Sequence, residues 1–159
     1  MIKYVKGDVL NVKTDYIAHQ VNTLGVMGSG LALDVKNKYP NVFVEYKRKC
    51  NELGEGLIGT YIPVQVPDSH LIILNCFSQK GISRTQKTTD YEAVKKVFKQ
   101  IEKSIKPGKI ISVPYKYGCG LANGDWNTVH KIFKDIFDKS DVILQIVRRW
   151  EWTEREKEL

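Results

Sequence analysis

One stretch of the chain decides the fold: Asn22-Thr23-Leu24-Gly25-Val26-Met27-Gly28-Ser29-Gly30-Leu31-Ala32. The residues before it, 16–21, have the pattern of a short strand, whereas residues 31–39 have the spacing of a helix. Glycines at such a junction let backbone N–H groups approach an anion closely, and the following helix N-terminus adds a favourable field. Taken alone, the loop also suits a tight turn. The stretch therefore predicts a strand–loop–helix unit, with an anion site as its functional interpretation.

Strand-like and helix-like segments alternate on both sides of this unit. Strands are expected at residues 2–5, 16–21, 57–66, 71–77, 110–113 and 142–147. Helices are expected at residues 31–39, at 40–53, from 91 to the Pro107-Gly108 turn, and at 129–137. Alternation of this kind is typical of an α/β domain. We predict a three-layer α/β/α sandwich with a mixed, largely parallel sheet of about six strands.

Length and composition indicate one soluble globular domain. The chain has 159 residues, of which 42% are hydrophobic and 27% charged, which allows a substantial core. No apolar run approaches the roughly 20 residues that span a bilayer, and the N-terminus enters a strand pattern without a signal-peptide core. Cys50, Cys76 and Cys119 lack a CxxC spacing, which favours reduced thiols. We expect a cytoplasmic protein without a membrane partner.

The formal net charge is +7, and the basic residues are spread along the chain. A solvated lysine-rich surface fits this charge, and so does an anionic partner such as nucleic acid or a phosphorylated small molecule. His19, His70 and His130 are scattered in the sequence, so no metal site is expected.

A second glycine-rich loop follows the strand expected at 110–113. It reads Tyr117-Gly118-Cys119-Gly120-Leu121-Ala122-Asn123-Gly124-Asp125-Trp126 and leads into a helix. Ligands of open α/β sheets bind outside the carboxyl ends of the strands, so two such loops at one sheet edge suit a pyrophosphate. The chain has no Walker A motif, and Leu33 stands where a GxGxxG motif needs its third glycine.

Four motifs together resemble the macrodomain superfamily. They are Gly7-Asp8-Val9, His19-Gln20-Val21-Asn22, the loop from Gly25 to Ala32, and Tyr117-Gly118-Cys119-Gly120-Leu121. The resemblance covers residues 1–147 as the macrodomain and leaves 148–159 as a charged tail, with Trp150 and Trp152, that packs on the body or frays. Two further motifs bring the chain closest to ADP-ribose-1''-phosphate phosphatase-like members: Asn75-Cys76-Phe77-Ser78-Gln79 and Thr89-Asp90-Tyr91. It is also similar to the branch of terminal ADP-ribose glycohydrolases and of the antitoxin that removes ADP-ribose from DNA.

The resemblance implies a hydrolase acting at C1'' of the distal ribose of an ADP-ribose derivative. The reaction would be dephosphorylation of ADP-ribose-1''-phosphate or removal of ADP-ribose from a conjugate. The expected partners are ADP-ribose or a derivative, including ADP-ribosylated protein or nucleic acid, with no cofactor and a monomeric chain. Two alternatives stay open, a non-catalytic ADP-ribose reader module and a basic nucleic-acid-binding domain.

The resemblance also assigns ligand-binding residues: Asp8, Val9, Gln20, Val21, Asn22, Met27, Gly28, Ser29, Gly30, Leu31, Ala32, Tyr117, Gly118, Cys119, Gly120 and Leu121. Asp8 would accept a hydrogen bond from the adenine amino group with the Val9 backbone beside it, or else only form a turn. Asn22 would hydrogen-bond the distal ribose or else cap its loop. Cys119 is expected to be a small loop residue, because no histidine lies near it in sequence.

The candidate catalytic residues are Asn22, His19, Lys80 and Asp125. His19 could move a proton near neutral pH if its ring faces the pocket; a buried, hydrogen-bonded ring is the alternative. Lys80 lies near the position of a lysine that attacks C1'' in the glycohydrolase branch, and it also suits a plain surface position. Asp125 could act as acid or base, or cap the next helix. The glycohydrolase branch has its aspartate where this chain has Ala122.

Overall fold

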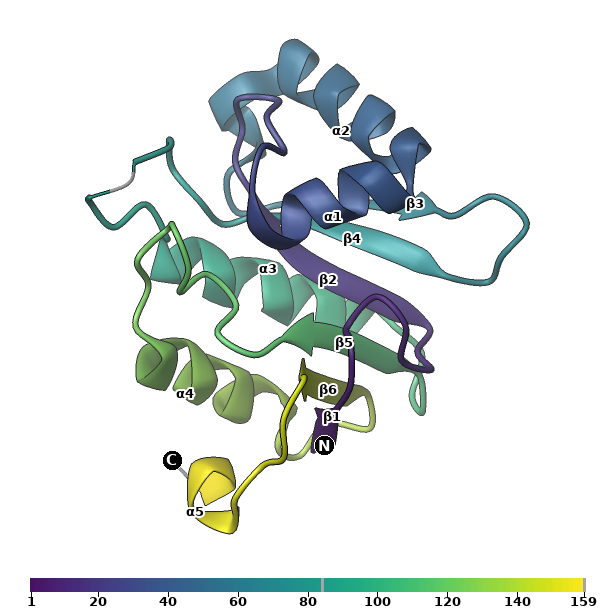
Figure 1. Cartoon of the computed structure of the whole chain (residues 1–159), viewed down its shortest axis with the longest axis vertical. Coiled ribbons are helices and arrows are strands. Elements are labelled where there is room, and N and C mark those ends of the chain that lie inside the picture. Colours follow the sequence, from purple (N-terminus) through teal and green to yellow (C-terminus); the bar gives the residue numbers. More distant parts are fainter. Residues whose placement is uncertain (84, 159) are drawn as a thin grey trace.

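The computed structural model describes residues 1–83 and 85–158. Its strands are β1 (Ile2–Lys6), β2 (Tyr16–Val21), β3 (Tyr61–Gln65), β4 (Ile72–Phe77), β5 (Ile110–Pro114) and β6 (Ile143–Arg148). Its helices are α1 (Gly30–Lys38), α2 (Pro40–Leu53), α3 (Tyr91–Ser104), α4 (Trp126–Phe137) and α5 (Glu154–Glu158), with a 3-10 turn η1 at Gly54–Leu57 (Figure 1). None of the helices in the described ranges is long and apolar enough to cross a membrane.

The six strands form one sheet in the order β1-β6-β5-β2-β4-β3. Neighbouring strands are parallel except for β3, which runs antiparallel to β4. The predicted mixed, largely parallel sheet is therefore confirmed. Because five strands point the same way, the loops that leave them gather at one edge of the sheet.

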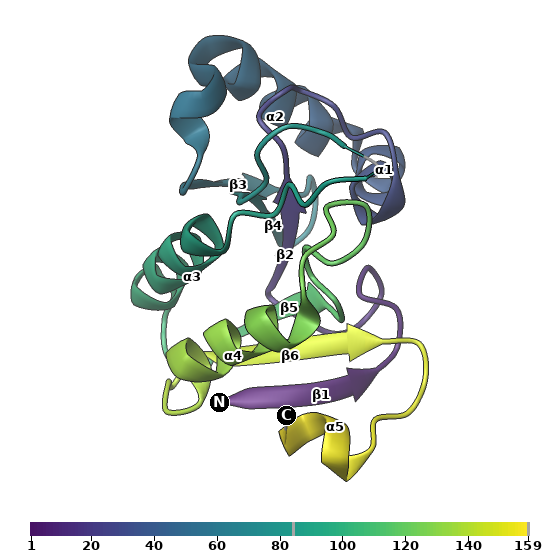
Figure 2. The ribbon, with the colours of Figure 1, turned by 90° about the vertical axis from the view of Figure 1, so that its left-hand side faces the viewer.

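Helices cover both faces of this sheet (Figure 2). Successive side chains of a strand point to opposite faces. On β2, Ile17 and Val21 pack with residues of α1 and α2, among them Val35 and Tyr46. Ala18 packs on the other face with the apolar sides of α3 and α4. The three-layer α/β/α sandwich follows from this alternation, as predicted.

Residues 57–66 differ from the predicted strand. Only Tyr61–Gln65 is extended, because Gly54–Leu57 forms η1. Gly54 ends α2 with a φ of 50°, a left-handed conformation that favours glycine. Leu57 is 4% exposed and packs with Tyr46 from this turn. An apolar pattern alone does not distinguish such a residue from the start of a strand.

The residues after β6 run beside β1. Trp152 donates its indole N–H to the Val5 carbonyl at 3.1 Å, and α5 lies along the outer side of β1 (Figure 2). Arg148, the last residue of β6, is only 5% exposed. The C-terminal segment is thus packed on the body through Arg148 and Trp152.

Candidate active site

A cleft of about 620 Å³ opens at the carboxyl ends of β2 and β5, which are neighbours in the sheet. One wall is the loop after β2 with the start of α1, and the other is the loop after β5. Most of the predicted ligand-binding residues line it: Gln20, Val21, Asn22, Gly28, Ser29, Gly30, Leu31, Ala32, Tyr117, Gly118, Gly120 and Leu121.

Sequence reasoning missed part of this lining. Pro114, Tyr115 and Lys116 also face the cleft, together with Val26, Gln79, Ile82, Ser83 and Ala122. The first three directly precede Tyr117, so the second glycine-rich loop contributes to the cleft from the end of β5 onward. The loop between β4 and α3 has no comparable glycine signal, and it reaches the cleft because β4 pairs with β2.

The loop after β2 is held in place by the residues that it buries against the core. Met27 is 1% exposed and packs with Val21 and Tyr46, so it anchors the loop and does not line the cleft. Gly25 and Gly30 have left-handed φ angles of 78° and 57°, which favour glycine. The loop can therefore present backbone to the cleft.

The N-terminus of α1 is open toward the cleft. Ser29 precedes the helix without a side-chain capping hydrogen bond, and the first turn has no acidic residue. In contrast, Asp90 caps α3 and Asp125 caps α4, each by accepting a backbone N–H of the first turn. The first N–H groups of a helix lack intrahelical partners and carry partial positive charge. α1 thus offers free donors to an anion.

Asn22 is held by three contacts. Its Oδ1 accepts from the Leu24 N–H at 2.9 Å, and its Nδ2 donates to the Val26 carbonyl at 2.9 Å. The buried Tyr46 hydroxyl lies 2.8 Å from both Oδ1 and the backbone carbonyl of Asn22. The loop-capping alternative is therefore observed. One N–H of the carboxamide is still available for a ligand.

A buried polar network clamps the second loop. The Thr89 hydroxyl donates to the Gly118 carbonyl at 2.6 Å and accepts from the Gln20 amide at 2.9 Å. Ser78 Oγ lies 2.8 Å from both Gln20 Oε1 and the Tyr117 hydroxyl. At Gly118 the φ is 72°, and a Cβ would lie 3.0 Å from Gln20, so only glycine fits well. The network ties the ends of β2, β4 and β5 together.

His19 lies in the floor of the cleft with its ring buried, 1% exposed. Its Nε2 is 2.8 Å from Asn75 Oδ1, and Asn75 donates through Nδ2 to the Ile62 carbonyl. This assigns the proton to Nε2 and leaves Nδ1 without a partner among the described residues. Burial lowers the pKa of His19 to about 4. The structure shows the buried alternative; a ring that faces the pocket and titrates near neutral pH does not fit this position.

Asp8 lies beyond the cleft lining, toward β1. Its Oδ1 accepts from the Leu10 N–H at 3.0 Å, and its Oδ2 accepts from the Asn11 side chain at 2.8 Å. Arg149 lies 3.5 Å from Oδ2. The Leu10 hydrogen bond, reinforced by Asn11 and Arg149, lowers the pKa of Asp8 despite partial burial. The carboxylate forms a turn, and its predicted contact with adenine, like that of Val9, requires a ligand that extends toward β1.

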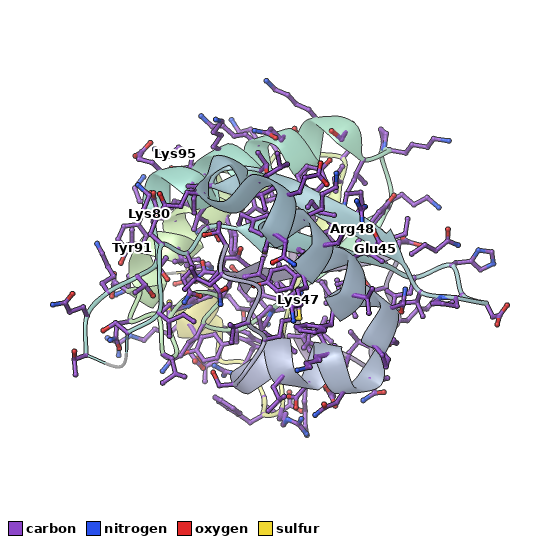
Figure 3. The ribbon with its side chains drawn as sticks, turned by 90° about the horizontal axis from the view of Figure 1, so that it is seen from above. Glu45, Lys47, Arg48, Lys80, Tyr91 and Lys95 are labelled. Carbon is purple, nitrogen blue, oxygen red and sulfur yellow. The ribbon has the colours of Figure 1, made fainter. Side chains whose placement is uncertain are left out.

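Lys80 lies next to the cleft-lining Gln79 but is not itself part of the lining. Its ammonium is 3.2 Å from the Asp90 carboxylate, and its side chain is 67% exposed. Figure 3 shows it on the same side of the molecule as Tyr91 and Lys95. Lys80 therefore occupies a surface position, one residue after the cleft-lining Gln79.

Asp125 and Cys119 also lie outside the lining. Asp125 accepts from the N–H and the hydroxyl of Thr128, at 3.0 and 2.8 Å, so it caps α4. Burial raises the pKa of Cys119 to about 11, which keeps this small loop thiol protonated. Among the residues the structure describes, no three His, Cys, Asp or Glu side chains are placed to hold a metal ion.

No family model matches the chain. A segment of 59 residues is 44% identical to the DNA ADP-ribosyl glycohydrolase of Mycobacterium tuberculosis, covering 37% of this chain but 16% of that relative's length. Over 162 residues the chain is 27% identical to the ADP-ribose 1''-phosphate phosphatase of Scheffersomyces stipitis, with 84% of the chain and 94% of the relative covered. The solved macrodomain of Mycobacterium tuberculosis DarG superimposes with a TM-score of 0.79 at 27% identity, covering 92% of this chain and 97% of that one.

The cleft, the uncapped helix and the opposing glycine-rich loop define an α/β domain that presents a ligand site across the carboxyl edge of its sheet. The same fold extends over nearly the whole length of the DarG macrodomain. The chain has the macrodomain fold, and the proteins it is similar to include ADP-ribose 1''-phosphate phosphatases and ADP-ribosyl glycohydrolases. The resemblance stated from four sequence motifs is confirmed.

Proposed function

We propose that this macrodomain is a hydrolase that binds an ADP-ribose derivative and acts at C1'' of the distal ribose. It would remove the phosphate of ADP-ribose 1''-phosphate or release ADP-ribose from a protein or nucleic-acid conjugate. One observation carries the proposal: the uncapped N-terminus of α1 faces the clamped glycine-rich loop, residues 118–120, across one cleft. Relatives named for both reactions support it.

The sheet order supports one orientation of the ligand. The pyrophosphate suits the space between the α1 N-terminus and residues 118–120, where backbone donors meet from two sides. Asp8 follows β1, two strands from β5, whereas Lys80 follows β4 on the other side of β2. The adenine therefore points toward Asp8 and the distal ribose toward Asn22 and the β4–α3 loop.

The reacting groups are assigned by this orientation. Hydrolysis gives the hydroxyl of water to one fragment and its proton to the leaving group. Asn22 holds the distal ribose through its available N–H, and Lys80 acts at C1'' after leaving Asp90, either as nucleophile or as a positive charge beside the leaving group. His19 is buried and neutral, and its hydrogen bond to Asn75 holds β2 against β4 beneath the cleft. Asp125 positions α4.

A reader module is a second candidate, and a specific observation favours it. Lys80 is paired with Asp90, and Asp125 is occupied as a helix cap, so neither side chain is directed into the cleft. A reader needs both loops but no reactive side chain. It predicts stoichiometric ADP-ribose binding without release of product.

Parallel assays decide between these functions. ADP-ribose 1''-phosphate, ADP-ribosylated protein and ADP-ribosylated DNA are incubated with the protein, and release of phosphate and ADP-ribose is measured. We expect turnover of at least one, reduced about 10²-fold by Asn22→Ala through misplacement of the ribose and by Lys80→Ala through loss of the group at C1''. Binding of ADP-ribose with no turnover would establish the reader. Absence of both would refute the ligand assignment.

Alanine substitutions at two glycines test the effect on ligand binding separately from the effect on folding. A Cβ at Gly120 or at Gly56 would meet nothing within 4 Å, and neither residue has a left-handed φ. Both alanine variants should therefore keep the melting temperature within about 2 °C of the wild type. Only Gly120→Ala places a methyl group where the backbone approaches phosphate, and it should weaken ADP-ribose binding about tenfold or more. Equal affinities would contradict the assignment of this loop to the pyrophosphate.

A further inference from the structure

A second cavity, the α3 hollow, has a volume of about 460 Å³ and lies between residues 58–59 and the first turns of α3. Three lysines line it, namely Lys95, Lys96 and Lys99. Asp90, the N-cap of α3, also lines the hollow, and its carboxylate holds the Lys80 ammonium at 3.2 Å. Figure 3 shows Lys80 and Lys95 at the same corner of the molecule. Because Lys80 directly follows the cleft-lining Gln79, the α3 hollow adjoins the end of the cleft to which the proposed orientation assigns the distal ribose.

The lysines of the α3 hollow share one face of the helix, because residues three and four positions apart are neighbours there. Lys103 continues this row by one more turn and is also exposed. Along the row of Lys95, Lys99 and Lys103, successive charges are about 6 Å apart in the direction of the helix axis. Like charges at this spacing repel one another and weaken the helix. A bound anion would remove this repulsion.

Few acidic groups neutralise these charges. Glu92 lies 3.8 Å from Lys95, but its side chain is 86% exposed, where water and salt screen the pair. Glu102, the next acidic residue of α3, accepts from the Ser140 hydroxyl at 2.9 Å. Within the described ranges, the other two lysines of the hollow have no ion pair. The hollow therefore presents positive charge that the protein itself leaves uncompensated.

The floor of the α3 hollow is fixed by Gly59. Its φ is 82°, its N–H donates to the Phe77 carbonyl at 2.9 Å, and its carbonyl accepts from the Gln100 side chain at 3.3 Å. A Cβ at Gly59 would lie 3.1 Å from Cδ of Lys96 and 3.6 Å from its Nζ. The glycine thus leaves room for the Lys96 side chain to lie along the turn, so its ammonium stands over the floor of the hollow.

The chemistry of the α3 hollow fits a chain of phosphates. Of the residues that line it, only Ile58 and Ala93 have apolar side chains, and Ala93 is 4% exposed. Protein partners are held mainly by buried apolar or aromatic anchors, and this lining offers them little. A nucleic acid carries one negative charge per nucleotide along its backbone, which a row of lysines can follow.

We propose that the α3 hollow is a second binding site, which holds the phosphate backbone of a nucleic acid through Lys95, Lys96 and Lys99. The site goes beyond the proposed function, because ADP-ribose in the cleft does not need these lysines. A strand held there would run past Lys80. Its placement relative to an ADP-ribosyl group rests on the proposed function: a conjugate attached at C1'' leaves the cleft at this end, so the hollow would raise the local concentration of the group at the cleft.

The test measures binding of a labelled, unmodified single-stranded oligodeoxynucleotide of mixed sequence by fluorescence anisotropy, between about 50 and 200 mM salt. The hollow variant combines Lys95→Gln, Lys96→Gln and Lys99→Gln, which keep most of each side-chain stem and the helix propensity. Each phosphate contact of a single strand contributes about 0.7 to the slope of log K against log salt, so this slope should become shallower by about 2. Near 0.1 M salt the affinity should fall about 10- to 100-fold.

The matched control combines Lys106→Gln, Lys109→Gln and Lys139→Gln. These lysines are exposed and lie at the opposite edge of the sheet, where β5 and β6 begin. The control loses the same net charge, and its affinity for the oligonucleotide should stay within about threefold of the wild type, because charges at that distance are screened. Both variants should keep the melting temperature within about 2 °C of the wild type.

Equal losses of affinity in the two variants would overturn the site, and so would a wild-type protein that does not bind the oligonucleotide. Competition by a poly-glutamate peptide as strong as that by unlabelled oligonucleotide would overturn the assignment to nucleic acid. ADP-ribose titration separates this site from the proposed function, since the hollow variant should bind ADP-ribose like the wild type. If the wild type binds the oligonucleotide but not ADP-ribose, the proposed function fails and the α3 hollow stands.

Discussion

Two adjacent threonines differ in their hydrogen bonding, and replacing each with valine tests whether the polar network fixes the second glycine-rich loop. The Thr89 hydroxyl donates to the Gly118 carbonyl and accepts from the Gln20 amide. The Thr88 hydroxyl is buried and has no partner among the described residues. Valine keeps the β-branched shape of threonine and removes only the hydroxyl. The two substitutions are thus matched in chemistry and opposite in expected outcome.

The expected change in the free energy of unfolding depends on which polar groups each substitution leaves without a partner. After Thr89→Val, the Gly118 carbonyl keeps its bond from the Gly124 N–H at 2.9 Å, and the Gln20 amide lies at the cleft where water can reach it. The loss is therefore that of one network hydrogen bond, about 1–2 kcal/mol, which lowers the melting temperature by about 2–8 °C. Thr88→Val removes a buried unpaired hydroxyl and should be neutral or stabilising by up to about 1 kcal/mol.

Calorimetric unfolding and ADP-ribose titration measure both consequences. Thr89→Val should also weaken ADP-ribose binding, because Gly118 is then released from its clamp. Thr89→Ser keeps the hydroxyl and should recover most of the affinity. The reasoning would be refuted if Thr88→Val lowered the melting temperature as much as Thr89→Val, or if Thr89→Val matched the wild type in both measurements.

Three other predictions test the buried contacts. His19 has a folded pKa of about 4 against 6.5 in the unfolded chain, so its stability contribution is present above pH 6.5 and lost as pH falls toward 4. Denaturant titrations at pH 7 and 4.5 should show a loss about 2–3 kcal/mol larger in the wild type than in His19→Gln, and equal losses would refute the burial argument. Tyr46→Phe removes the hydroxyl beside Asn22; it should cost about 1–2 kcal/mol in the free energy of unfolding and raise KM. The Arg148 hydrogen bond lowers the pKa of Glu156 to about 2, so this pair stabilises the fold above pH 4.5 and less as pH falls toward 2. Glu156→Gln should lower the melting temperature at pH 7 and flatten its dependence on pH over that range.

The sequence predicts the parts of this molecule that depend on local patterns. The strand at residues 16–21 and the helix at 40–53 match the structure because their apolar spacing and flanking residues are local signals. The glycine-rich loops are equally local: Gly25, Gly30 and Gly118 adopt left-handed angles that other residues resist. Most of the cleft lining could therefore be named in advance.

The roles of single polar residues could not be decided in this way. His19 shares a strand face with Ile17 and Val21, and only the helices over that face determine that its ring is buried against Asn75. The sequence around Asp125 suits both a catalytic acid and a helix cap, and only the folded position of Thr128, whose N–H and hydroxyl donate to this carboxylate, identifies the cap. The partnership of Thr89 with Gln20 joins residues far apart in the chain, and no periodicity encodes it.

The strand order is the least local of these features, and it has the largest effect on the site. Nothing in the pattern of residues 142–147 indicates that β6 lies between β1 and β5. Once it does, the residues after β6 emerge in the middle of the path from Asp8 to the second glycine-rich loop. They must then either contact a ligand on that path or turn away from it. Arg149 extends to the Asp8 carboxylate, and Trp150 stays exposed beside Tyr115. When the last strand of an α/β domain is interior to the sheet, the segment that follows it is brought to the ligand edge by the topology itself.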